Sequence, residues 1–188
     1  MQTLPQLEAH INGALNAGNS PIEIREAIYQ CAPFIGFPKT LNAIAAFNEA
    51  IKERGLEGEL KNASTVKEEE RYQRGHEIQN PMYGDEIAQN MKGLPGGMGK
   101  DVSRFLTEVC FGDFYTRKGL DVKTRELMTV AILTTTGNTG VLKSHIKGNL
   151  KAGNSMETIT AAIIQLAPYI GFPNTFAALK TVKEVANE

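Results

Sequence analysis

The chain has 188 residues, of which 41% are hydrophobic and 22% are charged, and both values are ordinary for a globular protein. Its formal net charge of −1 gives no electrostatic basis for binding nucleic acid or an anionic membrane, because both need a basic surface. The first residues lack the pattern of a signal peptide, and no apolar run approaches the roughly 18 residues of a membrane span. We therefore expect a cytoplasmic protein with no nucleic-acid or membrane partner.

The N-terminal part of the sequence predicts helices. Apolar residues at helical spacing indicate a first helix over residues 5–17. Ser20 as N-cap, Pro21 at the first helical position and Glu23 three residues after the cap are typical of a second helix start. We expect this second helix to end near residues 33–36.

A third helix is predicted over roughly residues 39–54, with core candidates Leu41, Ile44, Ala45 and Phe47. The polar stretch 55–70 has few large apolar residues and indicates a linker. A short helix over residues 68–78 should then end at Asn80-Pro81, because proline disfavours continuation of a helix.

Residues 81–99 are rich in glycine and include the run Gly93-Leu-Pro-Gly-Gly-Met-Gly99. A phosphate-binding loop is one interpretation of this run, but no strand is predicted before it and no Gly-Lys-Ser/Thr closes it. The default interpretation is a loop that folds over the surface or over a neighbouring subunit.

Helical periodicity returns over residues 101–115 and again over 121–137, where Asp121 is positioned as a cap. A helix containing His145, one opened by Ser155 and one from residue 173 to the C-terminus complete the chain. All predicted elements are helical, so the fold class is all-α.

The sequence contains a long internal repeat. Residues 10–43 and 145–178 align without gaps at an offset of 135, and 20 of the 34 positions are identical. Each copy begins His-x-x-Gly-x-Leu-x-Ala-Gly and ends in a Gly-Phe-Pro corner. The first copy lacks a counterpart of the helix over 121–137, so we expect an exposed apolar face there and a homo-oligomer.

The candidate chemical pair is Glu126 and His145, which lie on consecutive helices that a turn near residues 137–140 makes antiparallel. With about 1.5 Å of rise per residue, their heights differ by about 5 Å, which side chains can span. A carboxylate facing an imidazole fixes its tautomer and raises its basicity, as a general acid or base requires. The structural alternative is a core histidine bonded to a buried acid.

Four further residues cluster near the same helix junction: Arg117, Arg125, Lys118 and Tyr115. They are candidates for binding an anionic substrate through charge-assisted hydrogen bonds, and solvated surface charge is the alternative. The two cysteines, Cys31 and Cys110, form no metal or redox motif and are expected to be buried, inert thiols. No metal site and no cofactor site is predicted.

The repeated motif, the segment 111–120 and the run Thr124-Arg-Glu126 together resemble the carboxymuconolactone decarboxylase family. The resemblance covers residues 71–188 as a complete unit and residues 1–54 as a truncated first repeat, separated by the linker 55–70. It implies a helical bundle of the alkylhydroperoxidase D type that assembles as trimers or hexamers of family units. The decarboxylase members convert γ-carboxymuconolactone to an enol-lactone without a cofactor.

The peroxidase members of the family carry a glutamate, a Cys-x-x-Cys pair and a histidine in a fixed register. That register matches Glu126 and His145, whereas the cysteine positions are occupied by Asn138 and Val141. Thiol peroxidase chemistry needs a thiolate and a resolving thiol, so the alternative of an antioxidant protein with peroxiredoxin activity is disfavoured.

The leading hypothesis is a cofactor-independent lyase acting on a small carboxylated substrate. In it His145 is the acid/base, Glu126 orients it, and Arg117, Arg125, Tyr115 and Asn138 are candidate substrate-binding residues. A non-catalytic oligomeric scaffold is the further alternative. An enolate left by decarboxylation needs at least one proton donor and one cation.

Overall fold

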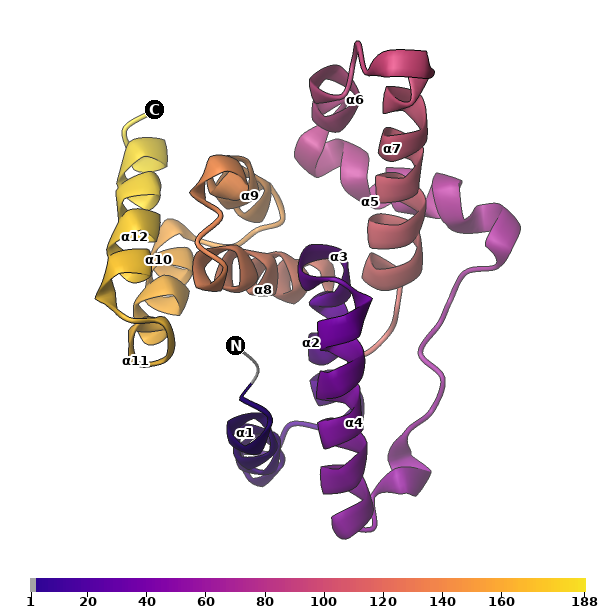
Figure 1. Ribbon diagram of the computed structural model, residues 1–188, viewed down its shortest axis with the longest axis vertical. Coiled ribbons are helices and arrows are strands. Elements are labelled where there is room, and N and C mark those ends of the chain that lie inside the picture. The colour runs from indigo at the N-terminus through magenta and orange to yellow at the C-terminus, as the bar shows by residue number, and fades with distance from the viewer. Residues whose placement is uncertain (1–2) are drawn as a thin grey trace. The chain divides into compact units, whose positions relative to one another are not determined.

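The computed structural model describes residues 3–188, and every regular element within them is a helix (Figure 1). The all-α prediction is therefore confirmed. Contacts divide the chain into two compact units, residues 1–65 with 117–120 and residues 66–116 with 121–188. Among the described residues, no helix is both long enough and apolar enough to cross a membrane.

The first unit contains the helices α1 (Leu4–Asn16), α2 (Pro21–Gln30), α3 (Ala32–Ile35) and α4 (Phe37–Glu53), followed by the short 3-10 turn η1 (Glu57–Glu59). The predicted start of α2 is confirmed by a reciprocal cap. The amide of Glu23 donates to Ser20 Oγ at 3.2 Å, and the amide of Ser20 donates to Glu23 Oε2 at 2.7 Å. The buried core of this unit is Ile11, Ile24, Ile28, Phe47, Ala50 and Ile51.

Two predicted core residues of the first unit, Leu41 and Ala45, are wrong, because both are exposed. Leu41 is 62% exposed, and Phe37, its neighbour on the same helix face, is 58% exposed. The repeat equivalents of these two residues, Phe172 and Phe176, are also exposed. Four large apolar side chains at matching positions of the two copies accordingly face outward, and the expected homo-oligomer stays a prediction.

The second unit contains η2 (Glu68–Glu70), α5 (Arg71–Tyr83), α6 (Glu86–Asn90), η3 (Pro95–Gly97), α7 (Gly99–Phe105), the π-helix η4 (Leu106–Tyr115), α8 (Val122–Thr135), α9 (Thr139–Lys151), α10 (Met156–Gln165), α11 (Ala167–Ile170) and α12 (Phe172–Ala186). The predicted helix over 101–115 is thus an α-helix continued by a π-helix. Such widened turns recur at functional sites.

The predicted stop of α5 at Asn80-Pro81 is wrong, because the helix continues to Tyr83 with Pro81 inside it. A proline removes one backbone hydrogen bond from a helix, but at Pro81 in the last turn it does not end α5. The helix ends instead at Gly84, whose φ of +55° is a conformation that glycine adopts readily. This extra turn is what places Tyr83 in the structure.

The repeat is visible in the helices themselves. The bounds of α1, α2 and α3 differ by 135 residues from those of α9, α10 and α11, respectively. In each copy a serine caps the second helix and a glycine with positive φ precedes the last one. Only the second copy has α8 beside it within its own unit, and α8 carries Glu126.

Helix α5 and the π-helix η4 approach each other closely at two glycines. A Cβ atom built on Gly75 would lie 2.3 Å from the carbonyl oxygen of Thr107, and one on Gly112 would lie 2.4 Å from that of Arg71. Beside this crossing, Arg71 forms an ion pair with Asp113. The crossing brings two tyrosines, at the ends of α5 and η4, to the same buried acid.

We predict that Gly75→Ala destabilises the protein by about 1–3 kcal/mol, because the new methyl group meets backbone atoms that cannot rotate away. The control is Gly13→Ala, since a Cβ on Gly13 meets nothing within 4 Å and alanine favours a helix. Urea denaturation measures both. Equal stability of the two variants would contradict the close backbone approach.

Candidate active site

The site is organised around the carboxyl group of Glu126, which lies on α8 and is fully buried. Its Oε1 accepts a hydrogen bond from the Tyr115 hydroxyl at 2.8 Å, and its Oε2 accepts one from the Tyr83 hydroxyl at 2.5 Å. Tyr115 is itself buried and also contacts Thr129 Oγ1 at 3.0 Å. Two phenols therefore hold one acid in place.

His145 reaches this acid through Tyr83. The Tyr83 oxygen lies 2.9 Å from His145 Nδ1, so a single hydroxyl contacts both members of the pair expected from the sequence. The Tyr83 ring also packs edge-on against the imidazole and tilted against Phe111. The direct carboxylate–imidazole contact that we expected is thus a three-residue chain, His145–Tyr83–Glu126, which we call the relay.

Gly148 makes room for the relay. A Cβ atom on Gly148 would lie 2.4 Å from the Tyr83 hydroxyl oxygen, so only glycine lets the phenol approach α9 there. This accounts for the His-x-x-Gly spacing in the second copy, in which the glycine follows His145 by one helical turn. In the first copy a Cβ on Gly13 meets nothing within 4 Å, and His10 is exposed.

Two buried asparagines fix the backbone around the relay. Asn149 Nδ2 donates to the carbonyl oxygens of Glu126 at 2.7 Å and His145 at 3.0 Å. Asn154 Nδ2 in turn donates to Asn149 Oδ1 at 2.8 Å and to the carbonyl of Lys123 at 2.8 Å. These bonds tie α8 to α9 at the level of the site.

Burial separates the pKa values of the two ends of the relay. It raises the pKa of Glu126 to about 7, although the hydrogen bonds from Tyr83 and Tyr115 act in the opposite direction. Burial lowers the pKa of His145 to about 4, and it raises the pKa values of Tyr83 and Tyr115. Near neutral pH the imidazole is uncharged, while Glu126 exchanges between acid and carboxylate.

A cavity of about 420 Å³ opens beside Tyr83. Its wall from α9 carries Lys143, Lys147 and Lys151, which follow each other at four-residue spacing on one helix face. The carboxylate of Glu188 pairs with Lys143 and, at 2.5 Å, with Lys147. A single carboxylate therefore fits between these two ammonium groups.

The other predicted binding residues are not among those that line this cavity. Arg117 belongs to the first unit, where its guanidinium donates twice to the buried carboxylate of Glu26, at 2.7 and 2.9 Å. Arg125 is fully buried, Asn138 is exposed at the N-cap of α9, and neither lines the cavity beside Tyr83. Tyr115 holds Glu126.

The surroundings of the two cysteines favour protonated thiols rather than reactive thiolates. Cys110 is buried and Cys31 is partly buried. Burial raises the pKa of Cys31 to about 11 and raises that of Cys110 as well, whereas a peroxidase needs a thiolate. Among the described residues there is also no cluster of three or more His, Cys, Asp or Glu side chains able to hold a metal.

The comparison with known families agrees with these features. The model of the carboxymuconolactone decarboxylase family matches residues 1–49 and 100–184. The chain belongs to this family. The two matched segments contain both repeats together with Glu126 and His145, while Tyr83 lies between them.

Two known proteins are similar to part of this chain. A 4-carboxymuconolactone decarboxylase from Acinetobacter baylyi is 26% identical over 121 residues, which are 64% of this chain and 90% of that protein. An uncharacterised 15.0 kDa protein from Paracoccus denitrificans is 32% identical over 85 residues, 44% of this chain and 63% of that protein.

The opposite pKa shifts predict a pH-dependent difference between the wild type and Glu126→Gln. The raised pKa of Glu126 gives stability that is present below about 4.5 and lost as pH rises through about 7. The lowered pKa of His145 gives stability that is present above about 6.5 and lost as pH falls through about 4. In the wild type these trends offset each other.

Glu126→Gln removes only the first trend. Relative to the wild type, its free energy of unfolding should rise between pH 5 and pH 8 by up to about 3 kcal/mol, as measured by urea denaturation. Glu59→Gln, on an exposed turn, is the control. A stability difference independent of pH would show that Glu126 titrates normally.

Proposed function

We propose that the protein is a decarboxylase-like lyase that acts, without a cofactor, on a small carboxylated substrate. The observation that carries this proposal is the relay, which joins a buried, protonatable acid to a lysine-lined cavity through one tyrosine. Membership of the family and the similarity to a 4-carboxymuconolactone decarboxylase support it.

The proposed reaction needs one proton and one cation. When the substrate carboxylate leaves as carbon dioxide, the electron pair of the broken carbon–carbon bond stays on the substrate as an enolate. Tyr83, which lines the cavity, gives its hydroxyl proton to the enolate carbon. In the acid form of Glu126 the proton lies on Oε2, so the hydrogen bond across the 2.5 Å contact runs from Oε2 to the Tyr83 oxygen, opposite to the bond that the carboxylate accepts. In the same step this proton moves to the Tyr83 oxygen, so that no free phenolate forms and Glu126 is left as the carboxylate.

The pKa values favour Glu126 as the store of this proton. Its pKa of about 7 means that a substantial fraction carries a proton at neutral pH, whereas the pKa of His145, about 4, leaves the imidazole neutral. We therefore propose roles different from those expected from the sequence. Glu126 supplies the proton, and His145 orients the Tyr83 hydroxyl.

Lys143 and Lys147 are the proposed cations. Both line the cavity, and the Glu188 carboxylate that bridges them has the chemistry of the group that the substrate would present. A substrate carboxylate placed there lies beside Tyr83. Arg117 is less suited, because taking it from the buried Glu26 would remove both of its hydrogen bonds to that carboxylate and leave the longer contact with Arg25 at 3.4 Å.

The first test of this proposal removes the Tyr83 hydroxyl. With 4-carboxymuconolactone as the first candidate substrate, Tyr83→Phe should lower kcat for carbon dioxide release by about 10²-fold or more. His145→Asn should also lower kcat. Because the acid form of Glu126 is the donor, wild-type kcat should fall as pH rises through about 7.

Glu126→Gln should abolish this alkaline fall together with most of the activity. Tyr72→Phe, at an exposed tyrosine of the same helix, is the matched control and should leave kcat unchanged. Turnover in Tyr83→Phe equal to that of the wild type would remove the relay from the mechanism.

A second test concerns the cations. Lys147→Gln should raise KM for an anionic substrate about tenfold with a smaller effect on kcat, since it removes a charge that binds rather than reacts. Lys123→Gln, an exposed lysine on α8, is the control. A KM unchanged in Lys147→Gln and in Lys143→Gln would place the substrate carboxylate elsewhere.

A further inference from the structure

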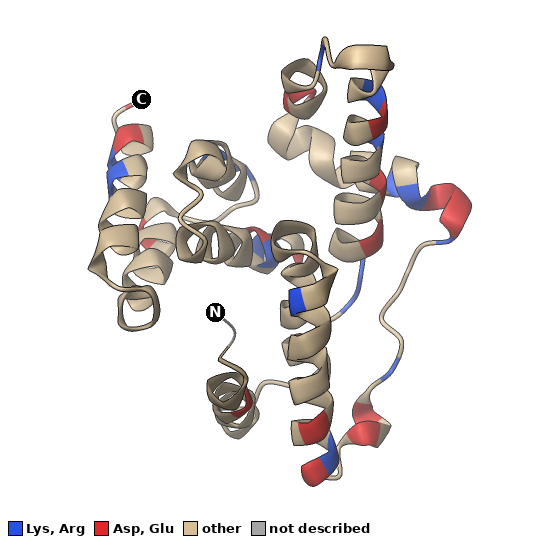
Figure 2. Ribbon diagram, viewed as in Figure 1, with Lys and Arg blue, Asp and Glu red and all other residues tan. Residues whose placement is uncertain are grey.

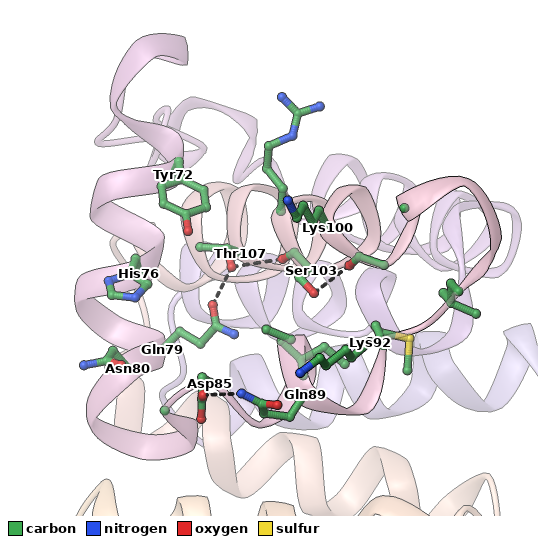
Figure 3. Close-up of a pocket in the computed structure, with 18 of the residues that line it drawn as sticks. Tyr72, His76, Gln79, Asn80, Asp85, Gln89, Lys92, Lys100, Ser103 and Thr107 are labelled. Atoms are coloured by element: carbon green, nitrogen blue, oxygen red, sulfur yellow. Dashed lines mark hydrogen bonds between the residues drawn. The ribbon is translucent and has the colours of Figure 1, made fainter.

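A second and larger cavity lies within the second unit, away from the relay. It has a volume of about 730 Å³ and is bounded by α5, α6, α7 and the start of η4 (Figure 3). None of Tyr83, Glu126 and His145 lines it. Its volume falls in the range of small-molecule binding sites.

One buried side chain is directed into this cavity. Gln79 is only 3% exposed, and its Oε1 accepts a hydrogen bond from the buried Thr107 hydroxyl at 2.6 Å. This bond turns the Gln79 amide nitrogen toward the open space, as Figure 3 shows. Within residues 3–188 that nitrogen has no hydrogen-bond acceptor, so the cavity presents an N–H donor to whatever occupies it.

The charge around the cavity is positive. Lys92, Lys100 and Arg104 line it, against a single acid, Asp85. The Asp85 carboxylate already accepts a hydrogen bond from Gln89 Nε2 at 2.8 Å. Figure 3 shows Lys92 and Lys100 on different segments that border the same space. Donor and cations together indicate an anionic ligand.

The rest of the wall indicates an apolar body on that ligand. Ile87, Met91 and Leu94 line one part of the cavity, and the rings of Tyr72 and His76 line another. These two rings are stacked, with centroids 6.0 Å apart and planes inclined by 15°. A flat or aliphatic body can pack on such walls while its anionic end meets the polar groups.

We propose that this cavity is a second ligand site, separate from the relay, which binds a small organic acid made of one carboxylate and an apolar body. The Gln79 amide donates a hydrogen bond to the carboxylate, and Lys92 and Lys100 neutralise its charge. The apolar body lies against Ile87, Met91 and Leu94. This site stands whether or not the protein is a lyase.

Benzoate is the probe, with benzamide as its uncharged analogue and acetate as the analogue without the body. Binding is followed by calorimetry and by the side-chain amide NMR signal of Gln79, which Gln79→Met assigns by removing it. Benzoate should bind in the millimolar range or tighter and shift this signal. Benzamide and acetate should each bind at least about tenfold more weakly.

The variants separate this site from the lysines of α9. Gln79→Met should weaken benzoate binding about tenfold, while Gln73→Met, an exposed glutamine on the same helix, should not. If Gln79→Met fails to fold, Lys92→Gln and Lys100→Gln, at exposed positions, provide the same test. Lys147→Gln should leave the shift of the Gln79 signal unchanged.

Three results would overturn the proposal. One is the absence of a Gln79 shift at about 10 mM benzoate. Another is binding that benzamide matches, because the cations would then play no part. The last is a shift lost in Lys147→Gln but kept in both Lys92→Gln and Lys100→Gln, which would assign benzoate to the smaller cavity.

Discussion

The structure of the site depends on keeping one carboxyl group out of water. A fully buried Glu126 is costly as an anion, and the surrounding elements lower that cost with hydroxyl donors from Tyr83 and Tyr115. Supplying those donors requires that α5 and the π-helix both end beside Glu126, in the first half of α8. The glycine crossing of α5 with η4 achieves this. The pKa of about 7 is the chemical result of incomplete compensation.

Much of the fold was predictable from local signals. Helical spacing and serine caps located the two repeated helix sets to within a few residues, because these features act within one or two turns. Glu126 and His145 could be singled out because they lie on consecutive helices. Tyr83 could not, since it is 43 residues from Glu126 and follows a proline that indicates the end of a helix. The prediction that Arg117 and Arg125 bind an anionic substrate rested on their positions in the sequence, which do not reveal the partners of these side chains in the fold. Glu26, the partner of Arg117, is 91 residues away in the sequence, so the pairing could not be predicted. The four-residue spacing of Lys143, Lys147 and Lys151, in contrast, does indicate three cations on one helix face.

The two copies show that the scaffold and the chemistry are separable. Both have the same succession of helices at the same spacing, yet only the second has α5, η4 and α8 within its own unit to provide an acid and two phenols. His10 keeps its place in the repeat but is exposed, whereas His145 packs against Tyr83, whose oxygen lies 2.9 Å from its Nδ1. The repeated motif encodes a helix pair, and the neighbours of that pair decide what the histidine does.

The glycines Gly148 and Gly13 illustrate this difference between a shared scaffold and different surroundings. In the second copy the space beside Gly148, where a Cβ atom would lie, is occupied by the Tyr83 phenol. In the first copy a Cβ atom on Gly13 would meet nothing within 4 Å. The same His-x-x-Gly motif therefore accommodates a tyrosine in the second copy and no neighbouring side chain in the first. Counting such motifs along the chain would suggest two equivalent sites, although only the histidine of the second copy has Tyr83, Tyr115 and Glu126 within its own unit. To give the first copy a similar arrangement, a designer could use the open space beside Gly13 and would need to add a tyrosine and a buried acid next to His10.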